Sequence, residues 1–257
     1  MIEMNGILDL DKQIISNITT YGKYSRFDPL LNRRETWPET VARNKQMHMD
    51  KFKHLYENDS EFRDLLDASY DAILNYKILP SMRSIHFGGK AIEVSNNRMY
   101  NCAFLPIDSF TAFSEAMFLL LGGTGVGFSV QKQNVKQLTP RKEKKESYIY
   151  IEIEDSIEGW ADAIRECVVG VMEGYTVKFD YDKIRPKGTI LKTSGGRAPG
   201  HEPLKNCIEN ITDLLETHIG VGDSLKPIHA HDIMCYLGDA VLSGGIRRSA
   251  MISLFDP

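Results

Sequence analysis

The sequence has no segment that marks a membrane or secreted protein. Its 257 residues contain no run of about eighteen apolar residues, and residues 1–6 lack a basic stretch followed by an apolar one, so we expect neither a membrane span nor a signal peptide. Positive charge is not in excess either, because 31 basic and 35 acidic residues give a net charge of −4. Attraction to nucleic acid or to an anionic membrane has no electrostatic basis. We therefore expect a cytoplasmic protein that binds neither.

Cysteine is scarce, and the four cysteines lie far apart, at Cys102, Cys167, Cys207 and Cys235. They form no Cys-x-x-Cys pair and no zinc-ligand pattern, so we expect no disulfide-stapled scaffold and no metal site. The last three fall in apolar registers of expected helices and should pack in the core. Cys102 lies in an expected strand, where a small buried side chain and a functional thiol both stay open, because reactivity depends on partners that the sequence does not show.

The composition that remains is that of an ordinary globular protein, with 42% hydrophobic and 26% charged residues. It allows one large domain or two smaller ones. Apolar periodicity predicts a helix over 38–56 and a second after the capping sequence at 58–60, ending before Leu79-Pro80. The first 80 or so residues are therefore expected to be helical, and residues 81–100 to be irregular.

From residue 101 onward, strands alternate with helices, which is typical of an α/β fold. Strands are expected at 148–153, at 177–179 and at 250–254, the last hardly paired. Helices should follow Asp108-Ser109 and Asp155 as capping residues, and two more should run from Leu204 to near 220 and through 233–241. The mixed-charge run 141–146 is expected to be a solvated loop. No internal repeat is visible.

The stretch that organises the chain is Asn-Cys-Ala-Phe-Leu-Pro at 101–106 with Gly-Gly-Thr-Gly-Val-Gly-Phe-Ser-Val at 122–130. It predicts two neighbouring strands joined through a helix, with a thiol near the first strand and a glycine turn before the second. The glycine spacing and the order of helix and strand do not fit a dinucleotide-binding or a Walker loop. Two later loops combine small residues with cations, Lys192 and Arg197 in one and Arg247 and Arg248 in the other, as suits phosphate or carboxylate ligands.

Seven stretches, in this order along the chain, resemble the catalytic subunit of ribonucleotide reductases, most closely the adenosylcobalamin-dependent (class II) ribonucleoside-triphosphate reductases, phage-type members included. They are Leu-Pro-Ser-Met-Arg (79–83), Asn-Cys-Ala-Phe (101–104), the glycine turn (122–130), the strand and helix start of 148–160, Ile-Arg-Pro-Lys-Gly (184–188), Ser-Gly-Gly-Arg-Ala-Pro-Gly (194–200) and Ser-Gly-Gly-Ile-Arg-Arg-Ser-Ala (243–250). The resemblance implies an N-terminal helical region (1–95) followed by the first half of a ten-stranded α/β barrel (96–257).

The resemblance also implies roles for individual residues. Cys102 matches the first cysteine of the pair that reduces the ribose and becomes a disulfide. Substrate contacts are implied for Ser81, Asn101, Gly125 and Arg247, in addition to Cys102, and the contact of Ser81 is with the substrate phosphates. Contacts to a deoxynucleoside triphosphate effector are implied for Asp108, Ser109, Lys192 and Arg197.

The resemblance covers only part of a reductase, because the radical-bearing cysteine and the second reducing cysteine of the family have no match here. The chain is therefore expected to need the C-terminal half of the reductase, together with adenosylcobalamin, a ribonucleotide substrate and a thioredoxin-like reductant. The short run at 141–146 favours a homodimer, because a monomeric family member carries a long insertion that mimics a partner. The alternative is a non-catalytic module that binds the effector or serves assembly.

Overall fold

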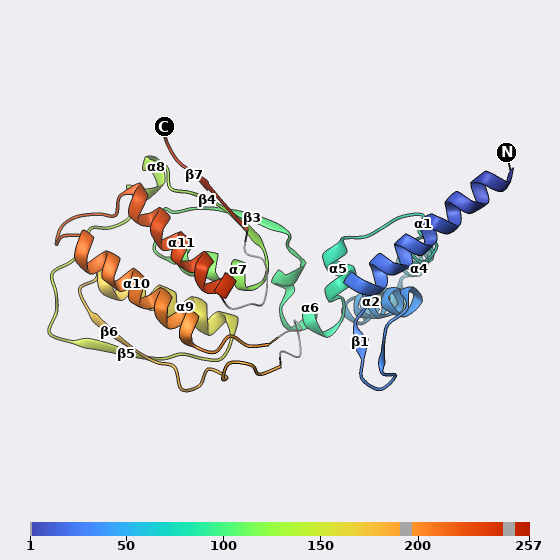
Figure 1. Cartoon of the computed structure of the whole chain (residues 1–257), viewed down its shortest axis with the longest axis horizontal. Helices are drawn as coiled ribbons and strands as arrows, with labels where there is room; N and C mark the ends of the chain where they lie inside the picture. The colour runs from blue at the N-terminus through green and yellow to red at the C-terminus, as the bar shows by residue number, and fades with distance from the viewer. Residues whose placement is uncertain (1, 191–196, 244–249) are drawn as a thin grey trace. The chain divides into compact units, whose positions relative to one another are not determined.

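The computed structural model describes residues 2–190, 197–243 and 250–257 and divides the chain into two compact units, 1–99 and 100–257 (Figure 1). This division falls after Met99, whereas the sequence predicts a boundary after residue 95. Each unit is described by itself. No helix of the described residues is long and apolar enough to cross a bilayer.

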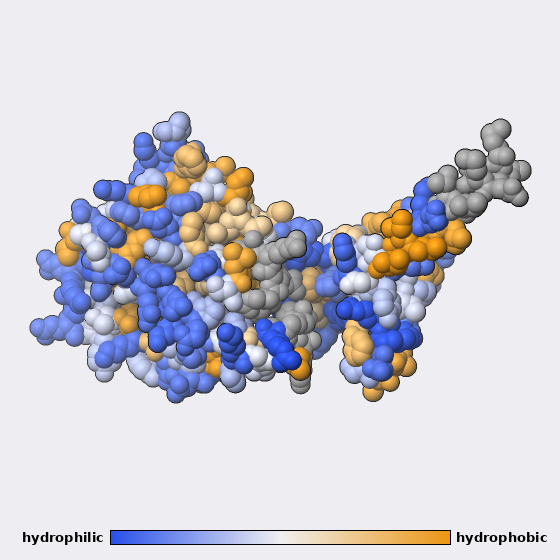
Figure 2. Space-filling model, viewed as in Figure 1, coloured by the Kyte–Doolittle hydropathy of each residue, from blue (hydrophilic) through white to orange (hydrophobic). Residues whose placement is uncertain are grey.

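Unit 1 is almost entirely helical. Its elements are α1 (Ile2–Lys23), the two-residue strands β1 (Phe27–Asp28) and β2 (Arg33–Arg34), α2 (Trp37–Lys51), α3 (Lys53–Asn58), α4 (Ser60–Leu74), α5 (Met82–Phe87), α6 (Lys90–Val94) and a 3-10 helix (Asn96–Met99). The predicted cap of α4 is confirmed, since the Asp59 carboxylate accepts a hydrogen bond from the Phe62 amide at 3.1 Å. On α1, exposed apolar side chains gather on the surface (Figure 2), namely Leu10, Ile14, Ile15 and Ile18.

Two expectations for unit 1 are wrong. Residues 81–100 are not irregular but form three short helices, which side chains of neighbouring elements hold in place. The second helix ends at Leu74, well before Pro80, because Tyr76 takes a positive φ of 56° and turns the chain away from the helix.

Unit 2 is a mixed α/β structure with parallel strands. Its elements are β3 (Cys102–Pro106), α7 (Thr111–Leu121), β4 (Gly125–Ser129), α8 (Lys132–Val135), β5 (Tyr148–Glu152), α9 (Ile157–Met172), β6 (Thr176–Asp180), α10 (Glu202–His218), α11 (Pro227–Ser243) and β7 (Met251–Leu254). One parallel sheet has the order β3-β4-β7 and another pairs β5 with β6. The strand β7 is paired with β4 along its whole length, so the expectation that it is hardly paired is wrong.

Four helices form the core of unit 2. Helix α7 packs against α9 and α11, and α10 packs against the same two helices, which closes a ring (Figure 1). The side chains at its centre are fully buried, among them Phe113, Met117, Ile164, Ile211 and Leu237. The apolar periodicity of 204–215 and 233–241 predicted these inward faces, and both helices are confirmed.

Unit 2 contains a structural repeat that the sequence does not show. Segments β3-α7-β4 and β5-α9-β6 each join two five-residue parallel strands through a helix that ends at a left-handed glycine, Gly123 (φ 84°) or Gly174 (φ 85°). The residue after the first strand donates its amide to the end of the second strand in both, Ile107 to Ser129 at 2.9 Å and Ile153 to Asp180 at 3.0 Å. The side chains differ because only the backbone plan and the inward apolar positions are shared.

Two expected caps in unit 2 are wrong. Helix α7 begins at Thr111, and neither Asp108 nor Ser109 caps it; the Ser109 hydroxyl lies 2.9 Å from that of Thr111. Helix α9 is capped by Ser156, which accepts from the Gly159 amide at 2.9 Å. Asp155 instead receives the Arg185 guanidinium at 2.6 Å, and this ion pair leaves the cap to the neighbouring serine.

Candidate functional site

Cys102 is the first residue of β3 and its side chain is exposed. In the parallel register it lies opposite Gly125 of β4. Residues that alternate along a strand share a face, and paired residues of parallel strands point to the same side. Cys102, Phe104, Gly125 and Gly127 therefore lie on one face of the sheet, opposite the face that carries the buried Leu105, Val126 and Phe128.

Gly125 has no side chain to fill the surface beside Cys102, its partner in the register. Its amide is not free for a ligand, since it donates to the Asn101 carbonyl at 2.9 Å. A Cβ at this position would lie 3.6 Å from that carbonyl and 3.7 Å from the Ala250 Cβ, which is ordinary van der Waals contact. The glycine is thus not required for packing, and its missing side chain leaves space next to the thiol.

An apolar strip continues from the thiol along the same face. Phe104 and Ile252 are 60% and 65% exposed and lie opposite Gly127 in the register. A Cβ at Gly127 would lie 3.4 Å from each of their side chains, at the near limit of ordinary van der Waals contact, so the two side chains close in on the glycine from both sides. The strip offers an apolar surface two residues from Cys102.

Thr124 holds the glycine turn against β3 and is a site residue that the sequence reasoning missed. Its side chain is 1% exposed, and its hydroxyl donates to the Tyr100 carbonyl at 3.3 Å, two residues before Cys102. Gly123 takes a φ of 84°, which permits the turn from α7 into β4. In the sequence, a threonine placed between glycines was the signal that could have indicated this residue.

The other three cysteines differ from Cys102. Cys167 and Cys207 are buried in α9 and α10, and burial raises the pKa of both thiols, that of Cys167 to about 11. Their predicted packing in the core is confirmed. Cys235 is exposed, with its sulfur 3.5 Å from Nε2 of His231, so its predicted burial is wrong. Burial of part of the side chain, followed by the charge of Asp232, raises the pKa of this thiol.

The remaining predicted site residues are scattered. Ser81 belongs to unit 1, where it precedes α5 and is exposed. Arg197 pairs with Ile190 in an isolated bridge and donates to the Gly188 carbonyl at 2.9 Å. Lys192 and Arg247 lie outside the described residues. No cluster of three or more metal-ligating side chains occurs within 2–190, 197–243 and 250–257.

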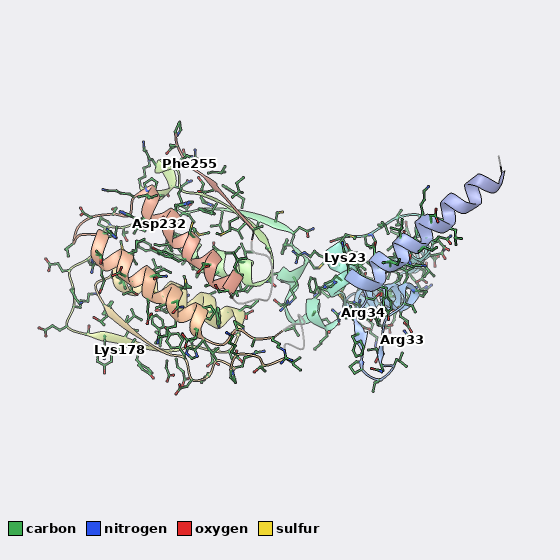
Figure 3. The ribbon with its side chains drawn as sticks, in the orientation of Figure 1. Lys23, Arg33, Arg34, Lys178, Asp232 and Phe255 are labelled. Atoms are coloured by element: carbon green, nitrogen blue, oxygen red, sulfur yellow. The ribbon has the colours of Figure 1, made fainter. Side chains whose placement is uncertain are left out.

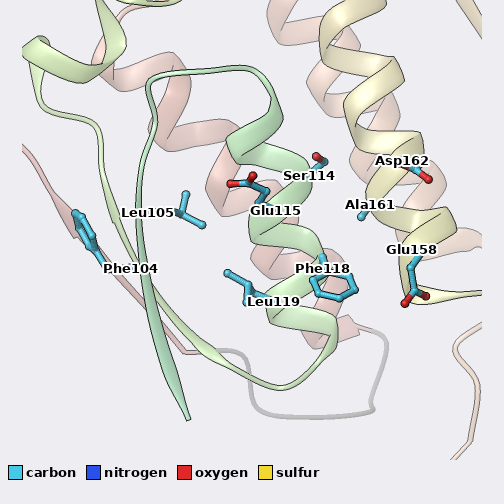
Figure 4. A pocket seen from close by; sticks show the side chains of 9 residues that line it. All are labelled: Phe104, Leu105, Ser114, Glu115, Phe118, Leu119, Glu158, Ala161 and Asp162. Carbon is cyan, nitrogen blue, oxygen red and sulfur yellow. The ribbon is translucent and has the colours of Figure 1, made fainter. Parts of the chain in front are cut away.

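Two cavities of unit 2 differ in the ligands that they could hold. The larger, about 500 Å³, lies between β3, α7 and α9. Figure 4 shows Glu115, Glu158 and Asp162 among its lining side chains, and three carboxylates would repel a triphosphate. The smaller, about 220 Å³, lies between α10 and α11 next to Lys187 and is lined by the polar side chains of Asn206, Asn210, Tyr236, Asp239 and Ser243.

Several known proteins are similar to this chain in sequence. No protein-family model matches the chain. A Dictyostelium discoideum protein named as a probable adenosylcobalamin-dependent ribonucleoside-triphosphate reductase is 30% identical over 266 residues, which cover 88% of this chain and 33% of the relative. The Euglena gracilis enzyme of that name is 29% identical over 238 residues, covering 85% of this chain and 32% of the relative. A similarly named protein of Mycobacterium phage D29 is 27% identical over 278 residues, covering 90% of this chain and 38% of the relative.

The solved structures give the same result for the fold. The crystal structure of a B12-dependent (class II) ribonucleotide reductase matches 93% of this chain and 41% of that protein, with a TM-score of 0.77 and 23% sequence identity. This confirms the fold class expected from the resemblance. The chain spans about a third to two fifths of the length of the curated relatives that it matches.

Proposed function

We infer that this chain is part of an adenosylcobalamin-dependent (class II) ribonucleoside-triphosphate reductase, the part with the N-terminal helices and the first parallel strands of the barrel. Similarity along 85–92% of the chain to reductases of that name supports this, as does the shared fold. The observation that carries the proposal is Cys102: the thiol that the chemistry needs is exposed at a strand end, beside a glycine that leaves space for a ligand.

In the proposed reaction, Cys102 acts as one of two reducing thiols. Its sulfur and a second cysteine sulfur from the remainder of the reductase give up two electrons and two protons and join in a disulfide. The ribose takes up the electrons and protons, its 2′ hydroxyl leaves as water, and a C–H bond takes its place. A thioredoxin-like dithiol then reduces the disulfide by exchange. The exposure of Cys102 suits both the substrate and the reductant, since each must reach the sulfur.

The cofactor's contacts belong elsewhere in this proposal. The relatives are adenosylcobalamin-dependent by name, and the resemblance assigns the cofactor the generation of the radical. Cavities of about 500, 220 and 310 Å³ in unit 2 are too small for a corrin ring with its nucleotide arm, and the largest is rimmed by carboxylates. None of these three cavities therefore fits the group, and we place its contacts elsewhere in the reductase.

Substrate and effector contacts complete the proposal. Ser81, Asn101 and Arg247 would contact the ribonucleotide, and Asp108, Ser109, Lys192 and Arg197 the effector. The cavity between α10 and α11 offers amide and hydroxyl groups that could contact part of a nucleoside, together with Lys187 and the carboxylates of Glu202 and Asp239. The α10 residue Cys207 forms part of its wall.

The experiment is a reductase assay on two samples, the 257-residue chain alone and the chain mixed with the rest of the reductase. With adenosylcobalamin, a dithiol and ribonucleoside triphosphates, we expect deoxyribonucleotide only in the mixture. Cys102→Ser should abolish turnover and leave effector binding intact, while Cys235→Ser, the other exposed cysteine, should keep turnover within about twofold, as expected for a surface change away from the site. Turnover by the chain alone, or by the Cys102→Ser mixture, would refute the proposal.

The second candidate function is a nucleotide-binding or assembly module without catalysis. The polar cavity between α10 and α11 favours it, because it needs nothing from the rest of a reductase. Binding of a deoxynucleoside triphosphate with no turnover in any mixture would support this alternative.

A further inference from the structure

The short helix α5 begins directly after Ser81, the residue to which the proposed function gives the contact with the substrate phosphates. The Ser81 side chain is exposed and makes no capping hydrogen bond. A helix of six residues is not stable by itself, because helix formation has a costly nucleus. The direction in which α5 presents Ser81 must therefore be fixed by residues outside the helix.

Side chains from elsewhere in unit 1 hold the carbonyl groups at the C-terminal end of α5. Arg43 of α2 donates to the carbonyls of Gly88 at 2.6 Å and Ile85 at 3.2 Å. Arg26 donates to the Phe87 carbonyl at 2.8 Å, and the Asn44 amide to the Ser84 carbonyl at 2.7 Å. Cations at this end of a helix also interact favourably with its dipole. Side chains from outside α5 thus bind the carbonyls of four of the five residues 84–88.

Glu35 in turn fixes Arg43. The carboxylate receives Nε of Arg43 at 2.8 Å and Nη2 at 2.9 Å, and both side chains are only 16% exposed. It also accepts from the Arg26 amide at 3.2 Å and the Thr40 hydroxyl at 3.3 Å. Burial favours the neutral acid, but the hydrogen bonds and charge of Arg43 outweigh it and lower the pKa of Glu35. The pair is therefore ionised at neutral pH.

Neighbouring atoms pack closely around Gly88 at the end of α5 and leave no space for a side chain there. A Cβ on Gly88 would lie 2.5 Å from the Asn44 amide nitrogen and 2.8 Å from the Ser84 carbonyl oxygen. The Asn44 amide oxygen is itself bound by the Tyr70 hydroxyl of α4 at 2.6 Å. Buried hydrogen bonds of Asn44 therefore join helices α2, α4 and α5, and Arg43 binds α5 directly.

We propose that Glu35 and Arg43 are positioning residues of the reductase, which lock α5 so that Ser81 meets the substrate phosphates at a fixed angle. The proposal rests on the proposed function, since that function supplies the role of Ser81. Neither residue touches substrate in this scheme. Their contribution is the orientation of a short helix that has no stability of its own.

The test compares Arg43→Gln with Arg33→Gln, a matched control in the same unit. Arg33 (Figure 3) makes the same two-bond ion pair, with Glu39 at 2.7 and 2.8 Å, but the pair is 41% and 42% exposed and does not touch α5. Arg43→Lys keeps the charge and some donor capacity, and serves where Arg43→Gln does not fold. Ser81→Ala reports the serine itself. Amide hydrogen exchange of 82–89 is measured on the 257-residue chain, and KM and kcat on the mixture with the rest of the reductase.

We expect Arg43→Gln to speed amide exchange in α5 and to raise KM for the ribonucleotide by about 10- to 100-fold, as for small misplacements of a binding group. Its kcat should stay within about threefold, Arg43→Lys should be intermediate, and Arg33→Gln should match the wild type. Faster exchange with an unchanged KM, while Ser81→Ala raises KM, would overturn the positioning role alone. An unchanged KM in Ser81→Ala would remove the role of Ser81 on which the proposal rests, and a wild-type mixture without turnover would refute the proposed function and this inference with it.

Discussion

At the scale of single residues, burial separates cysteines that look alike in the sequence. Cys167, Cys207 and Cys235 all fall in apolar helical registers, yet only the first two are buried. On α11 the inward positions are Ile233, Met234 and Leu237, and residue 235 lies on the flank of that stripe. The thiol there lies beside His231 on the preceding turn, as residues four apart on a helix do.

Alkylation should therefore divide the cysteines into two pairs. With iodoacetamide at about pH 8, we expect Cys102 and Cys235 to be alkylated in the folded chain and Cys167 and Cys207 to remain unmodified. The reagent attacks the thiolate, and burial raises the pKa of Cys167 to about 11, so this group stays protonated until the pH approaches that value. Peptide mass spectrometry gives the result, and all four cysteines should react in denaturant. Modification of Cys167 in the native chain would contradict the described core.

Arg141 shows that a charged residue can be a structural clamp. Its guanidinium donates to three carbonyls at the C-terminal end of α10, those of Leu215 (3.1 Å), Glu216 (3.2 Å) and Ile219 (2.7 Å). Its Nε is buried and makes no hydrogen bond. The cation thus satisfies carbonyls that a helix end leaves without partners.

Arg141→Gln should lower the free energy of unfolding of unit 2 by about 1–3 kcal/mol, because buried carbonyls lose their donors. Lys144→Gln is the control. The Lys144 ammonium is 3.6 Å from Glu216 and largely exposed, so its loss should cost less than about 1 kcal/mol. Urea unfolding followed through Trp160 in a Trp37→Phe background reads unit 2 alone, since these are the only tryptophans. Equal effects of the two substitutions would show that Arg141 is no clamp.

At the scale of elements, the run 141–146 is the largely exposed loop that its composition predicts, but its backbone is paired with another part of the chain. The amides of Lys142 and Lys145 donate to the carbonyls of Met172 (2.8 Å) and Gly174 (2.7 Å) at the end of α9. The Lys145 ammonium lies 3.7 Å from the centre of the Tyr175 ring. The backbone of the loop is thus paired with a distant turn, and a pattern of charges does not predict such a contact.

Gly174 closes this contact and gives a test of it. Its φ is 85°, and an added Cβ would clash with the Glu143 carbonyl oxygen. Gly174→Ala should therefore destabilise unit 2 by about 2–4 kcal/mol, the sum of a left-handed alanine and a forced backbone shift.

Gly222→Ala separates the two causes in the same urea experiment. Gly222 has a nearly equal φ of 84° but nothing within 4 Å of an added Cβ, so only the backbone cost of about 1 kcal/mol should remain. Equal losses at the two glycines would mean that the 141–146 segment does not press on the turn.

At the scale of the whole molecule, the helix ring of unit 2 limits the surfaces on which a homodimer, expected from the short 141–146 run, could form. Helices α9 and α10 of the same chain cover α7 and α11, and the facing side chains Phe113, Met117, Ile233 and Leu237 are fully buried. The β5-α9-β6 segment, which repeats the plan of β3-α7-β4, covers one side of α7. A homodimer stays a prediction for other surfaces only.

We expect hydrogen exchange in α7 and α11 to be independent of protein concentration. A second copy packed on these helices would protect them as concentration rises, because dimers form by mass action. Comparison of dilute and concentrated chain by exchange and mass spectrometry measures this, with exchange in α1, whose apolar side chains are exposed, followed in parallel. Protection gained in α7 or α11 would show that a second copy packs on these helices.

The sequence by itself determined the local plan of this protein. Alternating and periodic apolar positions identified the strands at 102–106, 125–129 and 148–152 and the faces of α9, α10 and α11, because burial of one face imposes a period on the chain. Seven ordered motifs led to the resemblance to reductases, which the similar proteins and the shared fold bear out. The roles of the individual site residues remain predictions.

Only the tertiary structure decided which residues far apart in the chain meet. Ser156 rather than Asp155 caps α9 because Arg185 takes the aspartate, and α5 is a helix because Arg43 and Asn44 bind its carbonyls. The repeat of β3-α7-β4 in β5-α9-β6 is likewise visible only in the backbone. Periodicity reports whether a position is inside, whereas the cap of α9 and the contacts of α5 depend on neighbours 30 to 45 residues away, which local patterns do not encode.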